Sequence, residues 1–336
     1  MPPEQVARYL VAEAVWAPSV HNTQPWRFVA TDQQISLYTD AGRGLPVADP
    51  DGREMMISCG AALFNVRLAL RALGYVPEVQ ALPEPGEPAL VARVGWRQRA
   101  AASEFERKLA DQVHRRRTHR GAFDPEPMPH GTIAALRDGA AREGAALRIM
   151  ADDGRRAVLA ATVQTAEQEL RLDGQRLKEL AEWAPAPGSE RSDGVPATAY
   201  PARAERTDPY FPGRDFARGH GWGLPPLGSA RSNRAAGVAG VLTTVTDRMA
   251  DWVNAGQALQ RILLTASACG AAVAIHSQPV ELPRLRELIR NQLTDGGHPQ
   301  LLLRMGMVIQ VAESVRRDPD DVLFRAGGGH VGGGGR

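Results

Sequence analysis

APSVHNTQPWRF, residues 17–28, is the stretch of this sequence that says most about its fold. An amphipathic pattern over residues 4–17 predicts a helix before it, and apolar residues predict a strand over Trp26–Ala30 at its end. Between the two, hydroxyl and amide side chains crowd into one loop with a proline near each end to stiffen it. Such a loop can present amides to a polar heterocycle, although a plain helix-to-strand connection could have the same composition.

A second segment, HRRRTHRGAF at residues 114–123, concentrates positive charge. If it is extended, Arg116, Thr118 and Arg120 share one face, because side chains alternate with a period of two. Two guanidinium groups beside a hydroxyl suit a phosphate dianion, which accepts charge-assisted hydrogen bonds. A solvated basic run at a domain junction would look the same. The pair Arg316-Arg317 follows the last predicted core strand and could close on the same phosphate.

Two parts of the chain repeat one plan. GAALFNVRLALRALGY at 60–75 aligns with GQALQRILLTASACGA at 256–271, which places Gly60 over Gly256. The strands that follow, ARVGW at 92–96 and LRMGM at 303–307, also align. Either match could arise by chance, because alanine, leucine and glycine are common. Both matches in the same order favour an internal duplication.

The remaining predictions complete this plan. Helices are expected over 54–73, 103–114, 131–142, 153–183, 250–269 and 283–293, and strands over 35–38, 90–96, 147–150, 238–246, 273–275 and 301–311. Residues 184–235 are crowded with Pro, Gly, Arg and Asp and predict a long irregular excursion. The Gly-rich tail at 327–336 is expected to be disordered.

Composition narrows the classes of function. Of the 336 residues, 43% are hydrophobic and 23% charged, as in soluble globular proteins. A net charge of +2 with dispersed arginines and few aromatics argues against a nucleic-acid-binding protein. Cys59 and Cys269 stand in apolar surroundings and are expected to be buried thiols in a reducing cytoplasm. Without a signal-peptide core or a membrane-length apolar stretch, a cytoplasmic location is expected, and no metal-ligand spacing, nucleophile elbow, Walker A or GxGxxG motif occurs.

Taken together, these segments resemble the nitroreductase superfamily, and within it the Acg family of actinobacterial flavin-binding proteins, over about residues 5–325. The tracts DPDGREMMISCGAALFN (49–65) and IHSQPVE (275–281) look more like Acg than like ordinary nitroreductases. The resemblance implies an α+β protein with the nitroreductase-like three-layer α-β-α fold and a bound FMN. It implies flavin contacts from the P-S-x-x-N-x-Q-P-W loop and from the segment after the central helix, and phosphate contacts from the R-x-S/T-x-R-type segment and the late arginines. The cofactor-binding residues implied in this way are Pro18, Ser19, Asn22, Gln24, Arg116, Arg117, Thr118, Arg120, Ser277, Gln278, Glu281, Arg316 and Arg317.

One departure from the family pattern predicts how the site is built. In ordinary nitroreductases, the loop and the phosphate segment of one site come from different subunits of a dimer. Here the N-terminal half, 1–102, has the loop but no basic segment, whereas the C-terminal half, 103–326, has the basic segment but a degenerate loop at 140–150. The chain is therefore expected to be a fused pseudo-dimer with one composite site, monomeric or homodimeric in solution, with 184–235 as a candidate lid.

The resemblance leaves the activity open between two classes. The first is an FMN-dependent oxidoreductase that accepts hydride at flavin N5 from NAD(P)H and passes electrons to a nitro compound, quinone or similar acceptor; the flavin does the chemistry, so no catalytic side chain is expected. The alternative is a flavin-sequestering protein with a lid over FMN and little NAD(P)H-dependent activity. A scaffold without flavin is a third hypothesis. His21, His276 and Arg53 could face the flavin or serve the structure.

Overall fold

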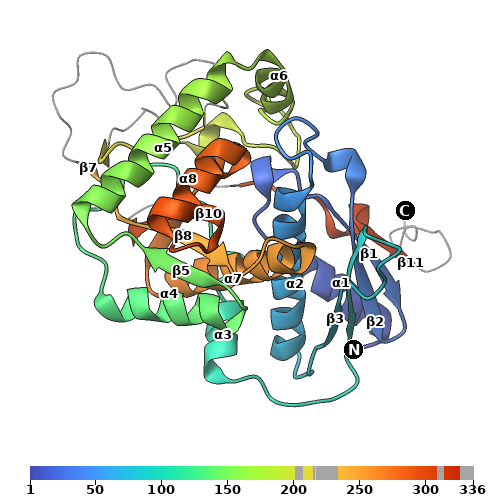
Figure 1. Cartoon of the computed structure of the whole chain (residues 1–336). Coiled ribbons are helices and arrows are strands. Elements are labelled where there is room, and N and C mark those ends of the chain that lie inside the picture. The colour runs from blue at the N-terminus through green and yellow to red at the C-terminus, as the bar shows by residue number, and fades with distance from the viewer. Residues whose placement is uncertain (201–206, 215, 217–233, 309–313, 326–336) are drawn as a thin grey trace.

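The computed structural model describes residues 1–200, 207–214, 216, 234–308 and 314–325, and most of its elements fall into two groups with the same order (Figure 1). The N-terminal group consists of α1 (Pro3–Ala14), β1 (Trp26–Thr31), β2 (Gln34–Thr39), α2 (Arg53–Ala72), β3 (Glu78–Ala81) and β4 (Leu90–Gly95). The C-terminal group consists of α4 (His130–Arg142), β5 (Ala146–Ile149), β8 (Val238–Thr244), α7 (Met249–Ala268), β9 (Ala271–His276) and β10 (His298–Met307).

The two sheets have the same strand order. The first sheet runs β11-β1-β2-β4-β3 and the second runs β5-β8-β10-β9. Apart from β11, corresponding strands occupy corresponding places, and every neighbouring pair among them is antiparallel. β11 (Leu323–Arg325) comes from the end of the described chain and adds to β1 in parallel. The predicted duplication is therefore confirmed in the topology, and the chain returns at its end to the N-terminal sheet.

The other elements connect or cover these groups. They are α3 (Glu104–Ala110), α5 (Asp153–Leu172), α6 (Gly174–Glu182), α8 (Pro283–Leu293), β6 (Thr207–Asp208), β7 (Arg234–Ala235) and the short helices η1 (Val20–Asn22), η2 (Ala41–Arg43), η3 (Ala197–Ala199), η4 (Gln278–Glu281) and η5 (Pro319–Asp321). The single helix predicted over 153–183 is wrong, because Asp173 is extended and interrupts it. Its carboxylate caps α6 by accepting the backbone N–H of Gln175 at 3.0 Å and that of Arg176 at 3.2 Å.

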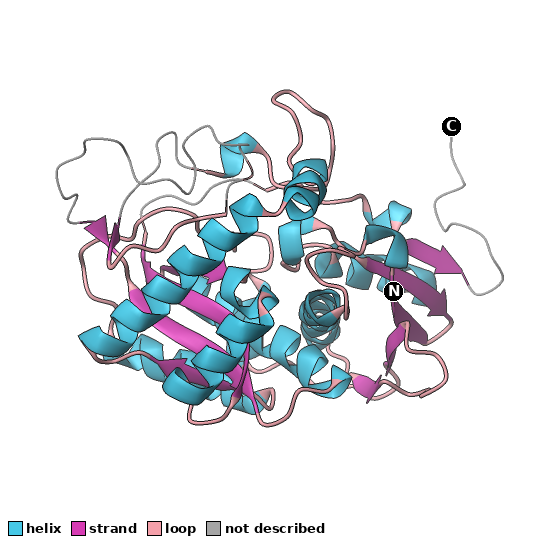
Figure 2. Ribbon diagram, turned by 45° about the horizontal axis from the view of Figure 1, so that its top comes forward, coloured by secondary structure: helices cyan, strands magenta, loops and turns pink. Residues whose placement is uncertain are grey.

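The C-terminal sheet is covered by helices on both faces, which makes the three layers visible in Figure 2. Successive residues of β10 point to opposite faces. Leu301 and Leu303 pack with α4 and α7, whereas Leu302 packs with α5 and α8. The predicted three-layer arrangement is thus the arrangement of this half.

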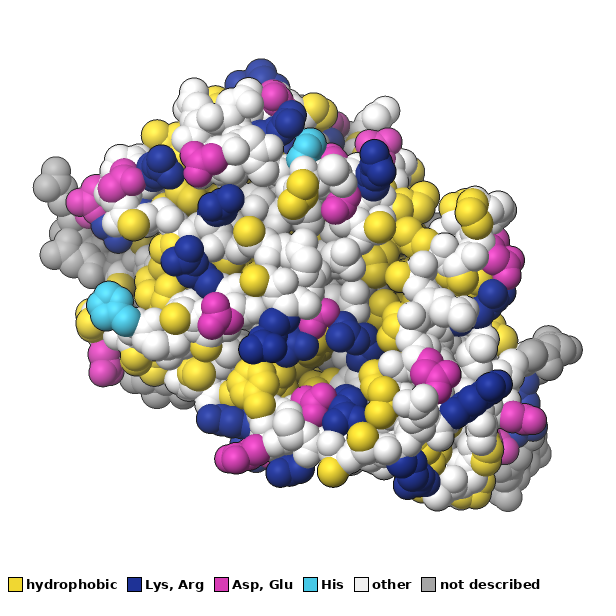
Figure 3. Space-filling view, turned by 60° about the horizontal axis from the view of Figure 1, so that its bottom comes forward, with side chains coloured by type: hydrophobic (Ala, Val, Ile, Leu, Met, Phe, Trp, Pro, Cys, Tyr) yellow, Lys and Arg dark blue, Asp and Glu magenta, His cyan; other side chains and the backbone are white. Residues whose placement is uncertain are grey.

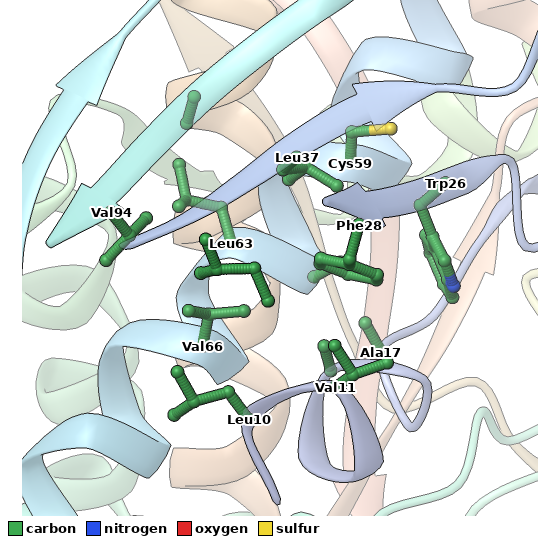
Figure 4. Close-up of a cluster of buried hydrophobic side chains, with 14 of the residues drawn as sticks. Leu10, Val11, Ala17, Trp26, Phe28, Leu37, Cys59, Leu63, Val66 and Val94 are labelled. Carbon is green, nitrogen blue, oxygen red and sulfur yellow. The ribbon is translucent and has the colours of Figure 1, made fainter. Parts of the chain in front are cut away.

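The N-terminal sheet packs one face against α1 and α2. Trp26 and Phe28 of β1 meet Leu63 of α2 and Leu10 of α1 in the cluster drawn in Figure 4. The side chains of β3 are exposed throughout, and this edge strand was not predicted because its sequence, EVQA, lacks an apolar pattern.

The two long helices α2 and α7 cross at the centre of the molecule (Figure 1). α2 is the one described helix with the length and apolar composition of a membrane span, but 78% of that window is buried inside the protein. Packing on several sides therefore accounts for its hydrophobicity.

Four further predictions concern the ends of elements or residues beyond the described chain. The helix predicted over 103–114 ends at Ala110, and β10 ends at Met307. Cys269 is exposed, against expectation, because it caps the C-terminus of α7 beyond the packed part of that helix, while Cys59 is buried. The predicted tail at 327–336 and residues 309–311 of the last predicted strand lie outside the described residues.

Candidate functional site

A cavity lies between the two groups of elements. The N-terminal group supplies the loop after α1 and the first turns of α2, and the C-terminal group supplies α7, β9 and β10. Most of the predicted site residues line it, namely Pro18, Ser19, Asn22, Arg117, Thr118, Arg120, Ser277, Gln278 and Arg316. The other four, Gln24, Arg116, Glu281 and Arg317, are not among its lining residues.

The loop after α1 has an unusual backbone. Three of the five non-glycine residues with positive φ in the described chain lie in it: His21 at 46°, Asn22 at 54° and Gln24 at 51°. Such angles are uncommon for residues with a side chain. They occur mostly at functional sites, where the surrounding structure enforces them. The backbone N–H of Gln24 donates to the hydroxyl of Ser19 at 2.9 Å, and that of Val20 to the hydroxyl of Ser58 at 3.1 Å.

The amides of this loop tie distant segments together. The side chain of Gln24 is fully buried, donates to the carbonyl of Ser192 at 2.8 Å and accepts from the backbone N–H of Arg317 at 2.8 Å. The Asn22 amide donates to the carbonyls of Gly194 at 2.9 Å and Val315 at 3.2 Å. Gln24 and Arg317 therefore shape the site from behind, whereas Asn22 does so from the cavity wall.

Four guanidinium groups gather at one side of the cavity and form the arginine cluster: Arg116, Arg117, Arg120 and Arg316. Burial, and then the positive charges of the other three, hold the pKa of Arg316 well below its ordinary value. Burial and the neighbouring Arg117 and Arg120 likewise lower the pKa of Arg116 to about 9. Guanidinium groups gathered in this way favour the binding of a counter-anion beside them.

Two members of the cluster, Arg116 and Arg316, have neutral hydrogen-bond partners among the described residues. Arg116 donates to the carbonyl of Trp16 at 2.9 Å and, at 3.4 Å, to the hydroxyl of Thr118. Arg316 donates to the side-chain oxygen of Asn22 at 3.2 Å and to the carbonyl of Val315 at 2.7 Å. The Nε atoms of both arginines are buried without a hydrogen-bond partner within the described part of the chain. Buried donors of this kind fit a bound anion.

The predicted alternation along this segment holds only in part. Thr118 is extended and forms a parallel bridge to Val273 at the edge of β9. Arg116 still belongs to a turn, since its N–H donates to the carbonyl of Gln112 at 2.8 Å. Consequently Arg117 and Arg120 line the cavity with Thr118, and Arg116 stands behind it.

Trp16 holds two cations of the cluster. The guanidinium carbon of Arg117 lies 4.8 Å from the centre of its ring and that of Arg316 lies 5.7 Å from it. The negative face of the indole offsets part of the repulsion between the two cations. The cluster is internal: among the described residues of the face in Figure 3, basic and acidic side chains are interspersed without a continuous basic surface.

Another part of the cavity wall carries different chemistry. Glu54 of α2 is 4% exposed, and burial, followed by the charge of Glu281, raises its pKa to about 8. Arg304 of β10 donates from Nε to Nε2 of His276 at 2.9 Å. Burial and the charge of Arg304 hold the pKa of His276 well below its ordinary value, which keeps that ring neutral and able to accept.

Of the predicted site residues that follow β9, two line the cavity and one lies behind it. Ser277 and Gln278 follow β9 and line the cavity, but Glu281 lies behind them, where it is paired with Arg214 and, at 3.4 Å, with Arg176. These ion pairs attach the excursion and α6 to η4.

Three further candidate residues differ in their position relative to the cavity. His21 lines the cavity, and neither of its ring nitrogens has a hydrogen-bond partner among the described residues. His276 also lines it. Arg53 does not, because its guanidinium donates to the carbonyl of Gln300 at 2.7 Å and to Glu54 at 3.0 Å.

Several cavity residues were not predicted. Glu54, Arg304, Tyr200, Arg214 and Phe216 all line the cavity. Glu54 has a signal in the sequence, an acid entering an otherwise apolar helix. The last three come from the irregular excursion, where no periodicity exists to place a side chain.

An ion-pair network lies at the segment of the C-terminal group that follows α4, as the loop 15–25 follows α1. Glu143, between α4 and β5, is buried and pairs with Arg67 of α2 and Arg261 of α7, each at 2.6 Å. Glu143 belongs to the segment 140–150, the degenerate counterpart of the N-terminal loop. Within the described residues, no group of three or more His, Cys, Asp or Glu is arranged to hold a metal ion.

Solved nitroreductases resemble the chain at low identity. A nitroreductase of Anabaena variabilis is 12% identical over 90% of this chain and 88% of its own, with a TM-score of 0.45. The FMN-dependent nitroreductase NfnB of Mycobacterium smegmatis, solved with NADPH, is 16% identical over 60% of this chain and 89% of its own, with a TM-score of 0.35.

Relatives in sequence are much closer. No family model matches the chain. A Mycobacterium tuberculosis H37Rv protein with the provisional name NAD(P)H nitroreductase is 36% identical over 310 residues, 91% of this chain and 86% of that protein. Acg of the same organism, also provisionally named an NAD(P)H nitroreductase, is 31% identical over 333 residues, 96% of this chain and 98% of its own. With this identity over nearly the whole length, the chain belongs to the nitroreductase family, in the group that includes Acg.

Proposed function

We propose that this protein binds one FMN between its two halves and acts as a cytoplasmic oxidoreductase of the nitroreductase type. The observation that carries the proposal is the arginine cluster, in which the buried Nε atoms of Arg116 and Arg316 lack partners among the described residues. A phosphate dianion in the cavity would offer an acceptor to Arg316 and negative charge to the whole cluster. The names of the sequence relatives support NAD(P)H as the electron donor.

The donor set fits an elongated ligand with one anionic end. Arg117, Thr118, Arg120 and Arg316 would hold the phosphate, and the strained loop at 19–22 would contact the ring system or the chain that links it to the phosphate. His21 offers ring nitrogens there that have no hydrogen-bond partner within the described ranges. FMN, when bound, supplies hydride and electron transfer, and the protein supplies binding, orientation and exclusion of water.

The small volume of the cavity supports the alternative function, in which the protein sequesters flavin. Its free volume is about 150 Å³, below the roughly 300–1,000 Å³ of typical ligand pockets. Tyr200 and Phe216 of the excursion occupy part of the wall, and Phe216 contacts the ring of His21 edge-on, with centroids 5.2 Å apart. We infer that these residues move outward when flavin binds and cover it afterwards, which would restrict access by a donor.

A comparison of FMN with riboflavin tests the phosphate assignment, because riboflavin has the same ring system and lacks the phosphate. In fluorescence titrations of flavin-free protein, Arg316→Gln and Arg120→Gln should weaken FMN binding by about 1.5–3 kcal/mol, or roughly 10- to 150-fold, and leave riboflavin binding nearly unchanged. Arg93→Gln is the matched control. Arg93 aligns with Arg304 in the internal repeat, but it lies at the surface, where it pairs with Glu84. Equal losses for both flavins would place the phosphate elsewhere.

An anaerobic reduction then separates enzyme from storage protein. Addition of NADH or NADPH to the FMN-loaded protein should bleach the flavin absorbance within seconds if the chain is an oxidoreductase. Bleaching by dithionite alone would reject the nicotinamide-dependent function and favour sequestration. Protein that stays colourless after soaking in FMN would reject both.

A further inference from the structure

Glu54 is the one carboxylate among the described residues that line the cavity. It belongs to the first turn of α2, where its backbone N–H donates to the carboxylate of Asp49 at 3.0 Å. Its own carboxylate accepts from the guanidinium of Arg53 at 3.0 Å, and its side chain is 4% exposed. The group is therefore held in place at the wall and shielded from bulk water.

The surroundings of Glu54 favour its protonated form over its ionised form. Arg53 of its own helix, Arg214 of the excursion and, more weakly, Arg286 of α8 favour the carboxylate. Asp49 of the preceding loop and Glu281 of η4 oppose it, and burial opposes it most. The resulting pKa of about 8 keeps Glu54 protonated at neutral pH.

Glu54 and the arginine cluster lie in different parts of the cavity. The charges that act on Glu54 are Arg53, Arg214, Asp49 and Glu281, whereas those that act on Arg316 are the other members of the cluster. A ligand whose phosphate is held by the cluster must extend its ring system along the remaining wall. That wall includes Glu54 together with the apolar side chains of Ile57, Leu259 and Leu301.

We propose that Glu54 is an internal proton donor for the reduction of the electron acceptor, an inference that rests on the proposed function. Reduction of a quinone to a hydroquinone takes two electrons and two protons. The hydride equivalent that originates from NAD(P)H brings both electrons and one proton, and the carboxylic acid of Glu54 gives the second proton to the acceptor oxygen. The resulting carboxylate is reprotonated from solvent. For a nitro compound, the same count yields the nitroso compound and water.

The geometry explains why a side chain is needed for this proton. A partly apolar cavity filled by flavin and acceptor leaves little room for the water that would otherwise supply it. A general acid works best when its pKa lies near the working pH, and such a group contributes about 100-fold or more to the rate. Arg304, another residue of the cavity wall, stays charged at neutral pH with a pKa of about 10 and is committed to His276 and to a backbone carbonyl.

The test compares two acceptors in stopped-flow experiments on FMN-loaded protein that has been reduced by light. A quinone needs the extra proton, whereas ferricyanide accepts one electron and no proton. In Glu54→Gln, the ratio of the quinone rate to the ferricyanide rate should fall about 100-fold, and Glu54→Asp should restore part of it. An unchanged ratio in Glu54→Gln would overturn the proposal. Because light replaces NAD(P)H, a failure of the nicotinamide reaction leaves this test intact.

A second readout follows the protonation of Glu54 as the pH changes. In the infrared spectrum of flavin-free wild-type protein, a carbonyl stretch of a protonated carboxylic acid should be present at pH 7, disappear as the pH rises through about 8 and be missing in Glu54→Gln, which separates it from the buried carboxyls of Asp49 and Glu167. The quinone-to-ferricyanide ratio of the wild type should fall over the same range. A carboxylate already ionised at pH 7, or a ratio independent of pH, would contradict the assignment.

Discussion

Gly60 and Gly256 pack reciprocally where the two central helices cross. Each is the eighth residue of a 20-residue helix, Gly60 in α2 and Gly256 in α7. Gly60 lies against the carbonyl of Val253 in α7, and Gly256 against the carbonyl of Ile57 in α2. Val253 and Ile57 are themselves equivalent, each three residues before a glycine. Such reciprocity is the signature of a two-fold axis at an interface between identical parts, here preserved within one chain.

Alanine at either glycine should destabilise the protein strongly. A Cβ at Gly60 or Gly256 would lie closer than 3.0 Å to backbone of the other helix, which no rotamer change can relieve. The free energy of unfolding should drop by about 3 kcal/mol or more for each variant, measured by urea denaturation. Since both substitutions push the same two helices apart, the double variant should lose less than the sum.

Gly131→Ala serves as the helical control for this pair. Gly131 lies in the first turn of α4, and a Cβ there meets no atom within 4 Å. Its substitution should leave stability unchanged or raise it slightly through helix propensity. Equal effects at Gly131 and Gly60 would mean that the close crossing does not matter.

Removal of one charge from the arginine cluster should have opposite effects with and without FMN. Arg316 is repelled by three neighbouring guanidinium groups, and no carboxylate among the described residues pairs with it. Arg316→Met should therefore raise the Tm of the flavin-free protein and reduce the gain in Tm on adding FMN. Differential scanning fluorimetry at a series of FMN concentrations measures both. A lower Tm without flavin, together with an undiminished gain, would contradict the account.

Glu54 makes stability depend on pH in a predictable direction. Its pKa is about 8 in the folded protein and near 4.5 when exposed on unfolding. Between these values the folded state binds a proton that the unfolded state releases, so stability falls as the pH rises from 4.5 to 8. Glu54→Gln removes this loss. Its Tm should exceed that of the wild type increasingly from pH 5 to pH 9, and a constant difference would rule out the raised pKa.

Trp16 should matter for its ring face more than for its size. Trp16→Leu removes the surface on which Arg117 and Arg316 rest, whereas Trp16→Phe keeps a weaker aromatic face. FMN affinity should fall by about 1 kcal/mol or more in the leucine variant and by less in the phenylalanine variant. Isothermal titration calorimetry can resolve the order. Equal losses in both variants would point to packing alone.

The sequence predicted most of the regular structure because the periodic patterns are long. The 20-residue helices α2 and α7 and the buried strands were placed to within a few residues, and their alignment predicted the repeated topology. The predictions were wrong where a local feature, such as a capping residue or a polar composition, outweighs the hydrophobic periodicity. Asp173 caps a new helix inside a run that reads as one, and β3 is too polar to predict as a strand.

The site was predictable only where its residues stand close together in sequence. The loop at 18–22 and the segment at 117–120 reach the cavity as expected. The buried supports Gln24 and Glu281 could not be told from cavity residues, because a sequence does not show which way a side chain turns. Tyr200 and Phe216 come from a stretch without periodicity and are placed by tertiary contacts alone.

The number of flavins bound per chain shows whether one composite FMN site lies between the two fused halves. Native mass spectrometry of protein saturated with FMN and freed of excess, with the oligomeric state read from the same spectrum, gives the number of flavins per chain. We expect one FMN per chain, lost in Arg316→Gln and retained in Glu143→Gln, because Glu143 is not among the residues that line the cavity. Two flavins per chain, or none, would contradict it.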